Sequence, residues 1–307
     1  MLYKFVRQKR IKVNGKRAEI GCKLCEGDIV ELYIKDEFLI ISDNRSFKNI
    51  IPNIKIIYED ANILLADKKP GMTVHPGDIK NKGDTEEINT LINHITAYLF
   101  NKGEYNPDIE NSFAPALCNR IDRNTGGIVI CAKNAESLRI INEKIKNKEI
   151  EKTYLCLVHG IPHKKQDILT AYHRKNADGN IVTIRKTNAD FAGSKIIKTQ
   201  YKVLNENKPE NISLVEVKLI TGRTHQIRAH LAYINHPLVG DGKYGNGETV
   251  KKDRKKGFYY QALYSYALKF AFAPDSDSGI LQYLNNKYFS VNTDDIPFLR
   301  EMCGENF

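Results

Sequence analysis

The 307-residue sequence lacks the features that mark membrane, metal-binding and nucleotide-binding proteins. No apolar run is long enough to cross a bilayer, and the first residues are basic where a signal peptide would be apolar, so we expect a cytoplasmic protein. Neither an H-E-x-x-H pattern nor a glycine-rich phosphate-binding loop is present. His225 and His230 are five residues apart, a spacing that does not place two ligands on one helix face. We therefore expect no metal and no other cofactor.

Cysteine is scarce and scattered. Several of the six residues lie in apolar, strand-like runs, which favours reduced, buried thiols in a reducing compartment: Cys22, Cys25, Cys118, Cys131, Cys156 and Cys303. Cys22 and Cys25 have the spacing of half a zinc site or of a redox pair, but no second pair with matching spacing follows. We interpret these two as packing residues, with a metal site as the alternative.

Positive charge is in excess. The chain holds 47 Lys and Arg against 37 Asp and Glu, which gives a net charge of +10. This balance favours a polyanionic partner, most often a nucleic acid in a soluble protein. The length predicts one large domain and a small one. Recurrent strands with only a few helices predict an α+β fold built on a mixed, mainly antiparallel β-sheet with flanking helices.

Residues 1–45 form a short, strongly basic segment. Asn14-Gly15 after an apolar run predicts a β-hairpin, and the alternation of Gly27–Ile34 predicts a strand. The V-N-G-K turn and the later G-D-x-V strand resemble part of the S4-like RNA-binding module, in a truncated form. That resemblance implies RNA contacts from the basic side chains of the segment, among them Lys9, Arg10, Lys12 and Lys16. A basic, solvated hairpin is the alternative.

The segment 119–127, N-R-I-D-R-N-T-G-G, is the most informative in the chain. Asp122 lies between Arg120 and Arg123 and is followed by the apolar run 128–132, which predicts a buried strand. The two glycines allow the backbone to turn tightly. A carboxylate close to positive charge stays ionised at neutral pH, and an ionised carboxylate can act as a nucleophile or a base. A structural ion pair that closes a loop is the alternative.

Three further segments carry polar motifs. The basic loop 68–77, K-K-P-G-M-T-V-H-P-G, follows a predicted strand, and such loops often carry function. In the segment 221–230, T-G-R-T-H-Q-I-R-A-H, five side chains can donate to phosphate or carboxylate, and the start of a helix there fits an anion-binding corner. The segment 236–245, H-P-L-V-G-D-G-K-Y-G, has turn chemistry at both ends, and we interpret Asp241 as a turn residue.

The remaining elements follow from periodicity and turn residues. We expect helices over 86–100 and 135–148, and strands over 152–160, 181–184, 198–204, 213–219 and 260–272. Tyr154 lies near the start of one of these strands, where half-burial in the core is the usual position of a tyrosine. The basic run 251–256 predicts a loop that is mobile or faces RNA, and residues 291–307 are expected to form a peripheral tail.

Taken in order, four motifs resemble the RNA pseudouridine synthases of the RluA type. They are K-P-G…V-H-P at 69–76, R-I-D-R at 120–123, T-G-R-T-H-Q-I-R-x-H at 221–230 and H-P-L-V-G-D-x-x-Y-G at 236–245. The resemblance implies a pseudouridine synthase catalytic domain over 54–290. It implies isomerisation of uridine to pseudouridine in structured RNA, with large-subunit ribosomal RNA as the expected substrate and tRNA as the alternative. We expect a monomer.

The resemblance also assigns residues. Asp122 corresponds to the essential catalytic aspartate, Tyr154 to the tyrosine that packs on the target base, and Arg228 to the arginine that pairs with the aspartate. RNA contacts are expected from the polar residues of the same motifs: Lys69, His75, Arg120, Arg123, Arg223, His225 and Gln226. The sequence departs from the family at Asn119, where a histidine is usual. We expect activity to persist with altered contacts to the flipped base.

Two other classes of protein could carry such residues. A catalytically silent RNA-binding or ribosome-assembly protein with the same fold would be expected to lose the acid or its arginine, and both are present. A glycoside hydrolase would need a second carboxylate that faces the first across the sugar. No acid in the motifs stands out for that role, since Asp241 is interpreted as a turn residue.

Overall fold

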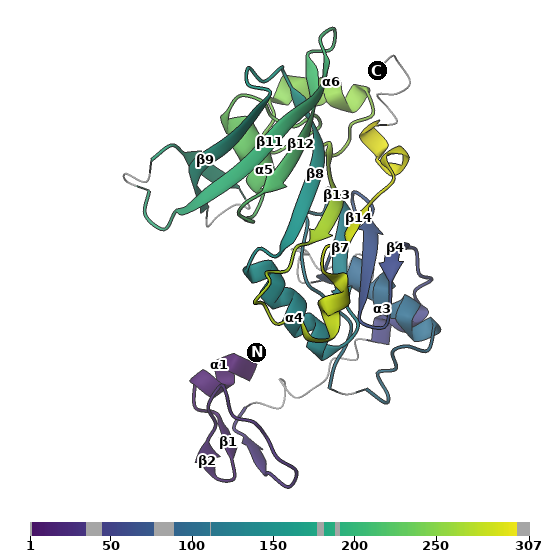
Figure 1. The fold of residues 1–307 in the computed structure, drawn as a ribbon, viewed down its shortest axis with the longest axis vertical. Coiled ribbons are helices and arrows are strands. Elements are labelled where there is room, and N and C mark those ends of the chain that lie inside the picture. Colours follow the sequence, from purple (N-terminus) through teal and green to yellow (C-terminus); the bar gives the residue numbers. More distant parts are fainter. Residues whose placement is uncertain are drawn as a thin grey trace. The chain divides into compact units, whose positions relative to one another are not determined.

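The computed structural model of the protein describes residues 2–34, 45–76, 89–110, 112–176, 181–187 and 191–299. The chain divides into two compact units, residues 1–46 and 47–307 (Figure 1). Within the described ranges, no helix is both long and apolar enough to span a membrane.

The small unit consists of one short helix and a three-stranded antiparallel sheet in the order β2-β1-β3. Its elements are α1 (Leu2–Arg7), β1 (Ile11–Val13), β2 (Lys16–Arg17) and β3 (Val30–Leu32). The expected hairpin is present: Asn14 and Gly15 both have positive φ, 50° and 74°, as a two-residue turn of this type requires. The Asn14 Oδ1 accepts a hydrogen bond of 2.9 Å from the Ile29 amide, which ties the turn to the segment before β3.

The side chains of the small unit lie largely in solvent. Lys9, Arg10 and Lys16 are exposed, and the Lys12 ammonium lies 4.9 Å from the centre of the Tyr33 ring. Cys22 and Cys25 are also exposed, so our interpretation of them as packing residues is wrong. A unit of this size has room for only a few buried side chains. Its relation to the S4-like module stays a prediction.

The large unit is built on one mixed sheet of eleven described strands in the order β10-β9-β11-β12-β8-β13-β7-β5-β4, with β14 beside β13 and β6 beside β7 (Figure 1). Among the described strands of this sheet, only β13 and β7 pair in parallel. The predicted mainly antiparallel α+β fold is therefore confirmed. The strands are β4 (Lys55–Glu59), β5 (Ile63–Lys68), β6 (Ala116–Leu117), β7 (Gly126–Ala132), β8 (Ile150–His159), β9 (Gln166–Lys175), β10 (Val182–Arg185), β11 (Lys195–Asn207), β12 (Ile212–Leu219), β13 (Leu263–Phe270) and β14 (Tyr288–Ser290).

Helices cover both faces of the sheet. They are α3 (Leu91–Asn101), α4 (Ala135–Lys146), α5 (Gln226–Tyr233) and α6 (Gly247–Lys255). The described chain also contains the 3-10 turns η2 (Arg45–Asn49), η4 (Gly279–Leu284) and η5 (Thr293–Asp295). On β5, Ile63 and Leu65 share a core cluster with α4, whereas Leu64 and Ala66 share one with α3. Because successive side chains of a strand point to opposite faces, α3 and α4 lie on opposite sides of the sheet. Burial on both faces explains the unbroken apolar runs of β5 and β7.

The face that carries α3 also carries α5. Tyr154 and Cys156 of β8 share a core cluster with Ile227 of α5, whereas Leu155 between them belongs to the cluster of α4. Ile121 packs against both the α5 cluster and the α3 cluster. The residue that follows it, Asp122, is therefore held where these two helix-covered cores meet.

Gly126 and Gly127 serve a close approach of strands rather than the tight turn we expected. A Cβ on Gly127 would lie 2.2 Å from the carbonyl oxygen of Ser265 on β13, and a Cβ on Gly126 would lie 2.3 Å from the Tyr264 ring. Gly127 also has a φ of 109°, which L side chains rarely adopt. The parallel pairing of β7 with β13 thus depends on these glycines.

Three expected elements differ from the structure. The helix expected over 86–100 begins at Leu91, and residues 77–88 lie outside the described ranges. Residues 251–255 belong to α6 and not to a loop, because the Asn246 side chain caps its first turn and Val250 and Asp253 are buried under it. The segment expected as a peripheral tail packs into the core through Val291, Ile296 and Phe298.

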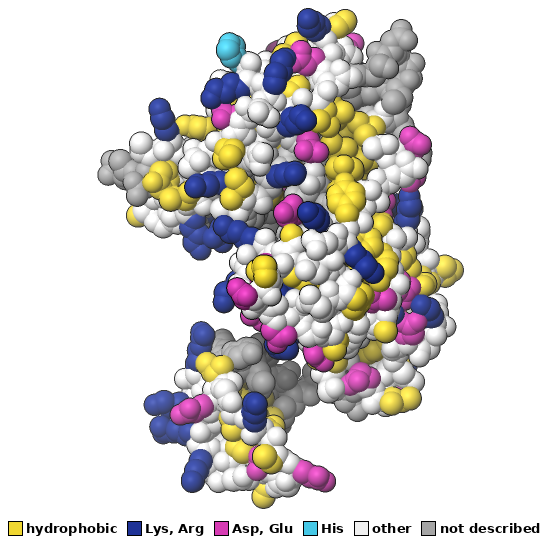
Figure 2. All heavy atoms as spheres, viewed as in Figure 1, with side chains coloured by type: hydrophobic (Ala, Val, Ile, Leu, Met, Phe, Trp, Pro, Cys, Tyr) yellow, Lys and Arg dark blue, Asp and Glu magenta, His cyan; other side chains and the backbone are white. Residues whose placement is uncertain are grey.

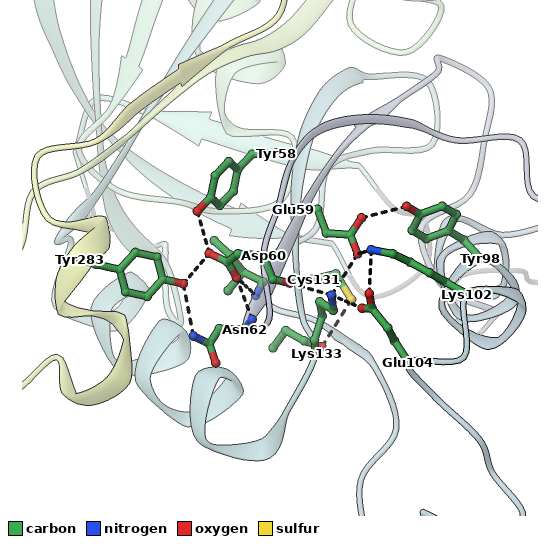
Figure 3. A network of polar contacts seen from close by, with 12 residues as sticks. Tyr58, Glu59, Asp60, Asn62, Tyr98, Lys102, Glu104, Cys131, Lys133 and Tyr283 are labelled. Carbon is green, nitrogen blue, oxygen red and sulfur yellow. Dashed lines mark hydrogen bonds and ion pairs between the residues drawn. The ribbon is translucent and has the colours of Figure 1, made fainter.

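A polar network stabilises the end of the sheet near β4 (Figure 3). Three donors converge on the Glu59 carboxylate, each at 2.9 Å: Tyr98, Lys102 and Lys133. Beside it, Asp60 accepts from the hydroxyl of Tyr58 at 2.8 Å and from that of Tyr283. Each charged group shown has a partner of opposite charge or a hydroxyl donor, so we interpret the network as structural.

Candidate active site

Arg228 of α5 contacts Asp122 directly. One of its terminal nitrogens, Nη1, donates a hydrogen bond of 2.9 Å to Asp122 Oδ2. The aspartate side chain is 27% exposed, whereas that of the arginine is 8% exposed. The Asp122 carboxylate is thus partly exposed to solvent, and a buried guanidinium binds one of its oxygens. The flanking Arg120 and Arg123, which we expected to hold the carboxylate, have exposed side chains.

Arg228 is itself fixed by a second carboxylate. Its Nε and Nη2 donate to the two oxygens of Asp241, each at 2.8 Å, in a bidentate pair. Asp241 is fully buried and also accepts from the backbone amides of Lys243 and Tyr244. Our interpretation of Asp241 as a simple turn residue is therefore incomplete, because it anchors the guanidinium that holds Asp122. Both its oxygens are occupied, which leaves it unsuited to act as the second acid of a glycoside hydrolase.

Arg228 and Asp241 each stabilise the charged form of the other. Burial opposes the charge on Arg228, but its hydrogen bonds to Asp241 and the charges of both aspartates outweigh burial and raise the pKa of the guanidinium. Burial alone would likewise raise the pKa of Asp241, and the Arg228 guanidinium outweighs it and lowers that pKa. The arginine is therefore a permanent positive charge beside Asp122.

Lys68, at the end of β5, joins two loops of the site and was not singled out from the sequence. Its side chain is fully buried, and its ammonium donates to the carbonyl oxygens of Lys69 at 2.9 Å, Met72 at 2.9 Å and Arg123 at 2.8 Å. These three bonds use all the donors of an ammonium group. Burial lowers the pKa of Lys68 to about 7, against the opposing charges of Asp122 and Asp67.

The loop 69–76 is tied to the aspartate segment on its other side as well. The amide of Gly71 donates to the carbonyl of Arg123 at 3.0 Å, and the Arg123 Nε donates back to the Gly71 carbonyl at 3.1 Å. Lys69 is exposed, with its ammonium 3.2 Å from Asn53 Oδ1. His75 is exposed and, with Arg120, borders a largely apolar pocket of about 350 Å³.

Tyr154 approaches the same site from β8. Only 6% of it is exposed, and it packs in the core cluster that contains Ile227 and Ile121. Burial raises the pKa of its phenol to about 12, and the nearby charge of Asp122 adds to that shift. The ring is therefore fixed and neutral near pH 7, with its hydroxyl protonated.

The polar residues of the segment 221–230 divide into two groups. Arg223 is exposed beside the start of α5, as an RNA contact requires. His225 lies 3.9 Å from Asp122 with only 5% of its side chain exposed, so the structure places it inside the site and not on the surface expected to contact RNA. Gln226, expected to contact RNA, is 2% exposed, and its amide donates to the Lys198 carbonyl and the Thr199 hydroxyl. The expectation for Gln226 is wrong, because its side chain joins α5 to β11 inside the protein.

Asn119, which stands where the family usually has histidine, is also an interior residue. It is 8% exposed, and its Oδ1 accepts a hydrogen bond of 2.8 Å from the Ile130 amide of β7. Its side chain therefore positions the aspartate segment against the sheet. The pairing of Cys118 with Ile130 through the backbone reinforces the same connection.

Comparison with known proteins assigns the chain to a family of RNA-modifying enzymes. The profile of the RNA pseudouridylate synthase family matches residues 62–233, which contain Asp122, Tyr154 and Arg228. The chain belongs to this family and is an RNA pseudouridine synthase of the RluA type.

The relatives include proteins of similar length. An uncharacterised RNA pseudouridine synthase of Mycoplasma capricolum subsp. capricolum is 32% identical over 295 residues, which cover 96% of this chain and 89% of the relative. Ribosomal large subunit pseudouridine synthase C of Rickettsia bellii is 33% identical over 260 residues, 81% of this chain and 79% of the relative. The solved structure of human RNA Pseudouridylate Synthase Domain Containing 1 has the same fold, with a TM-score of 0.57 and 19% identity over 83% of this chain and 96% of that one.

Proposed function

We propose that this enzyme converts uridine to pseudouridine with Asp122 as the catalytic carboxylate. The observation that carries the proposal is the position of Asp122: it reaches solvent, while the buried Arg228 holds one of its oxygens. The reaction breaks the bond between C1′ and N1 of uridine and joins C1′ to C5. C5 loses a proton and N1 gains one, so the reaction needs no redox partner. An ionised carboxylate can add to C1′ or remove the 2′ proton, and both routes use the same charge.

The surrounding residues fit the handling of a flipped base. An enzyme that acts on a base takes it out of the stack and holds it against aromatic or apolar side chains. The neutral, fixed ring of Tyr154 is suited to pack on the uracil. The exposed cations of the neighbouring loops, Lys69, Arg120, Arg123 and Arg223, are suited to the phosphates on either side.

The large unit also offers a wider basic surface. Figure 2 shows Lys and Arg side chains gathered over the part that contains β9 and β11. The exposed lysines of these strands and of β12 include Lys175, Lys198, Lys202 and Lys218. Lys198, Lys202 and Lys218 alternate with Thr199, Tyr201 and Val217, which are buried on the α5 side, so these lysines lie on the face of the sheet opposite Asp122. We infer that an RNA which reaches them extends beyond the target nucleotide and around the edge of the sheet, mainly through phosphate contacts, which fix the position of an RNA and not its sequence.

Large-subunit ribosomal RNA is the substrate we propose, with tRNA as the alternative. Relatives from Rickettsia bellii and Borreliella burgdorferi carry the name ribosomal large subunit pseudouridine synthase, and both are 33% identical to this chain. We further propose that the enzyme acts as a cytoplasmic monomer without a cofactor. A silent RNA-binding or assembly role is the competing proposal.

The test is a map of pseudouridines in ribosomal RNA and tRNA from cells with and without the protein. We expect one or a few positions of large-subunit RNA to lose the modification, and to regain it when the parent gene is returned. Loss confined to tRNA would reject the proposed substrate. Identical maps, combined with a defect in ribosome assembly, would favour the silent role.

For Tyr154, we expect phenylalanine to retain measurable turnover and alanine to lose most of it. Stacking on a base requires a ring, and loss of such a ring costs about 1–3 kcal/mol per base. Pseudouridine formation in a single turnover compares the three proteins, with the melting temperature as a control for the lost packing. Complete loss in both variants would instead indicate that the phenol transfers a proton.

Removal of residues 1–45 is expected to leave an active catalytic unit that binds RNA more weakly and with a shallower salt dependence. Each phosphate contact contributes about 0.7–0.9 to the slope of log affinity against log salt, and the small unit exposes Lys9, Arg10 and Lys16. RNA affinity measured across a salt series gives both quantities. An unchanged slope would show that the small unit does not contact RNA.

A further inference from the structure

His225 lies at the start of α5 in a conformation that points its ring between two partners. It is the residue before the first turn of the helix and has the left-handed backbone conformation, with φ 51° and ψ 22°. Its Nδ1 lies 2.9 Å from the Tyr244 hydroxyl, and its Nε2 lies 3.9 Å from Asp122 Oδ2. Only 5% of the side chain is exposed.

The hydrogen bonds of Tyr244 favour one of the two neutral forms of His225. The Tyr244 oxygen accepts a hydrogen bond of 3.0 Å from the backbone amide of Val182 on β10. The Tyr244 hydroxyl has one proton and two lone pairs, of which Val182 uses one, so its proton is available for donation to His225 Nδ1. With the opposite tautomer, a lone pair of Nε2 would face the negative Asp122 oxygen. Both arguments favour the form with the proton on Nε2.

The surroundings keep this ring neutral. Burial lowers the pKa of His225 to about 4, the charges of Arg228 and Lys243 act in the same direction, and those of Asp122 and Asp241 oppose them. At neutral pH the ring therefore carries one proton and no net charge. The Nε2–H group directs the positive end of a dipole toward Asp122.

The two groups that approach Asp122 do so on the same oxygen. Arg228 Nη1 donates to Oδ2, and His225 Nε2 faces Oδ2. Among the residues that the structure describes, Asp122 Oδ1 has no hydrogen-bond donor. The carboxylate thus has one oxygen directed into the protein and one left for the substrate.

We propose that His225, held by Tyr244 as the neutral form with its proton on Nε2, is a positioning residue that acts with Arg228 on Asp122 Oδ2 and leaves Oδ1 as the reacting oxygen. The inference rests on the proposed catalytic role of Asp122. At 3.9 Å the contact is longer than a hydrogen bond, so in the free enzyme the effect is electrostatic. Such contacts often shorten in the complex with substrate.

The first test measures the tautomer itself and needs no substrate. Nitrogen-15 NMR of the labelled full-length protein distinguishes protonated from unprotonated ring nitrogens, and comparison with His225→Gln assigns the signals of His225. We expect Nε2 protonated and Nδ1 unprotonated at pH 7, and a mixture of tautomers in Tyr244→Phe. A ring protonated on Nδ1, or on both nitrogens, would overturn the proposal whether or not the enzyme makes pseudouridine.

The second test compares two amides at position 225. Glutamine can place an N–H group near the position of Nε2, whereas asparagine reaches only as far as Nδ1. Asparagine tolerates the left-handed conformation better than glutamine, so a purely structural role would favour His225→Asn. For kcat we expect the reverse order. His225→Gln should stay within about tenfold of the parent, and His225→Asn should be lower by a further factor of about ten. The larger of these losses reaches at most the lower end of the roughly 10²–10³-fold loss that follows removal of an oxyanion-hole donor.

His230 provides the matched control. It lies on the same helix, is 1% exposed, has its Nδ1 3.0 Å from the Thr199 hydroxyl, and has a pKa that burial lowers to about 4. His230→Gln and His230→Asn should show no such order in kcat. Equal kcat for the two variants at 225, or a change confined to KM, would reject the positioning role. If Asp122→Asn kept its turnover, the proposed function would fail instead.

Discussion

Asp122→Asn is expected to fold, to bind RNA and to form no pseudouridine. Asparagine keeps the size of the side chain and an oxygen that can accept from Arg228 Nη1, which now lies 2.9 Å from Oδ2. The fold around it depends on Ile121 in two core clusters and on the glycine contacts of β7 with β13, and the substitution changes neither. What it removes is the negative charge.

Both chemical routes need that charge. Addition to C1′ requires an anionic nucleophile, and removal of the 2′ proton requires a base. We therefore expect turnover to fall by more than about 10³-fold, as for the loss of other single catalytic groups. The assay is the release of tritium from RNA labelled at C5 of uridine, because C5 gives up its hydrogen in the reaction.

Two control measurements separate this result from a structural effect. The melting temperature and the RNA affinity of Asp122→Asn should stay close to those of the parent, because the Arg228 guanidinium keeps its bidentate pair with Asp241 and the asparagine oxygen can still accept from Nη1. Arg120→Gln is a matched surface variant in the same segment and should retain turnover while binding RNA more weakly. Tritium release by Asp122→Asn at more than a trace of the parent rate would remove Asp122 from the chemistry.

The sequence predicts which side chains meet in the site better than it predicts the residues that anchor them. Asp122 and Arg228 stand in two of the four ordered motifs, Tyr154 lies on a predicted strand between them, and the structure brings all three to one face of the sheet. Lys68 and Asp241 were not recognised as part of the site. A lysine at the end of a strand and an aspartate between glycines are typical of exposed turns, and only the tertiary fold shows that both are buried and paired.

The reverse error arises for Gln226 and for the helix α6. Gln226 lies among donors that suit an anion, but the direction of its side chain depends on where β11 passes, 27 residues earlier in the chain. The basic run 251–256 favours a loop by composition. Yet the cap at Asn246 and the hydrogen bond of the buried Asp253 with the Gly240 amide stabilise a helix. Neither contact can be predicted from the distribution of charged residues.

The second large effect is expected from substitution of Arg228. Combined with a change at Asp241, this substitution allows the effect on stability to be measured apart from the effect on turnover. Arg228→Met removes the only described side chain that donates to both oxygens of Asp241 and leaves that carboxylate buried. Loss of one partner of a buried ion pair costs about 3–5 kcal/mol of the free energy of unfolding. Arg228→Lys should also lose activity, because an ammonium cannot form the bidentate pair and still reach Asp122.

A compensating change should restore the fold without restoring the reaction. In Arg228→Met with Asp241→Asn, no buried charge is left unpaired, and the asparagine oxygen can still accept from the amides of Lys243 and Tyr244, now 2.9 and 3.2 Å from Asp241 Oδ1. We expect the double variant to recover most of the lost stability, to within about 1–2 kcal/mol of the parent. Its turnover should stay as low as that of Arg228→Met, because Asp122 still lacks its arginine.

Urea unfolding of the parent, both single variants and the double variant gives the coupling energy of the pair, and single-turnover assays on the same four proteins give the rates. Asp241→Asn alone is the informative intermediate. It keeps the cation beside Asp122 but weakens its anchor, so its rate should lie between those of the parent and Arg228→Met. If turnover returned together with stability in the double variant, Arg228 would matter only for folding, and the orientation of Asp122 by its guanidinium would be excluded.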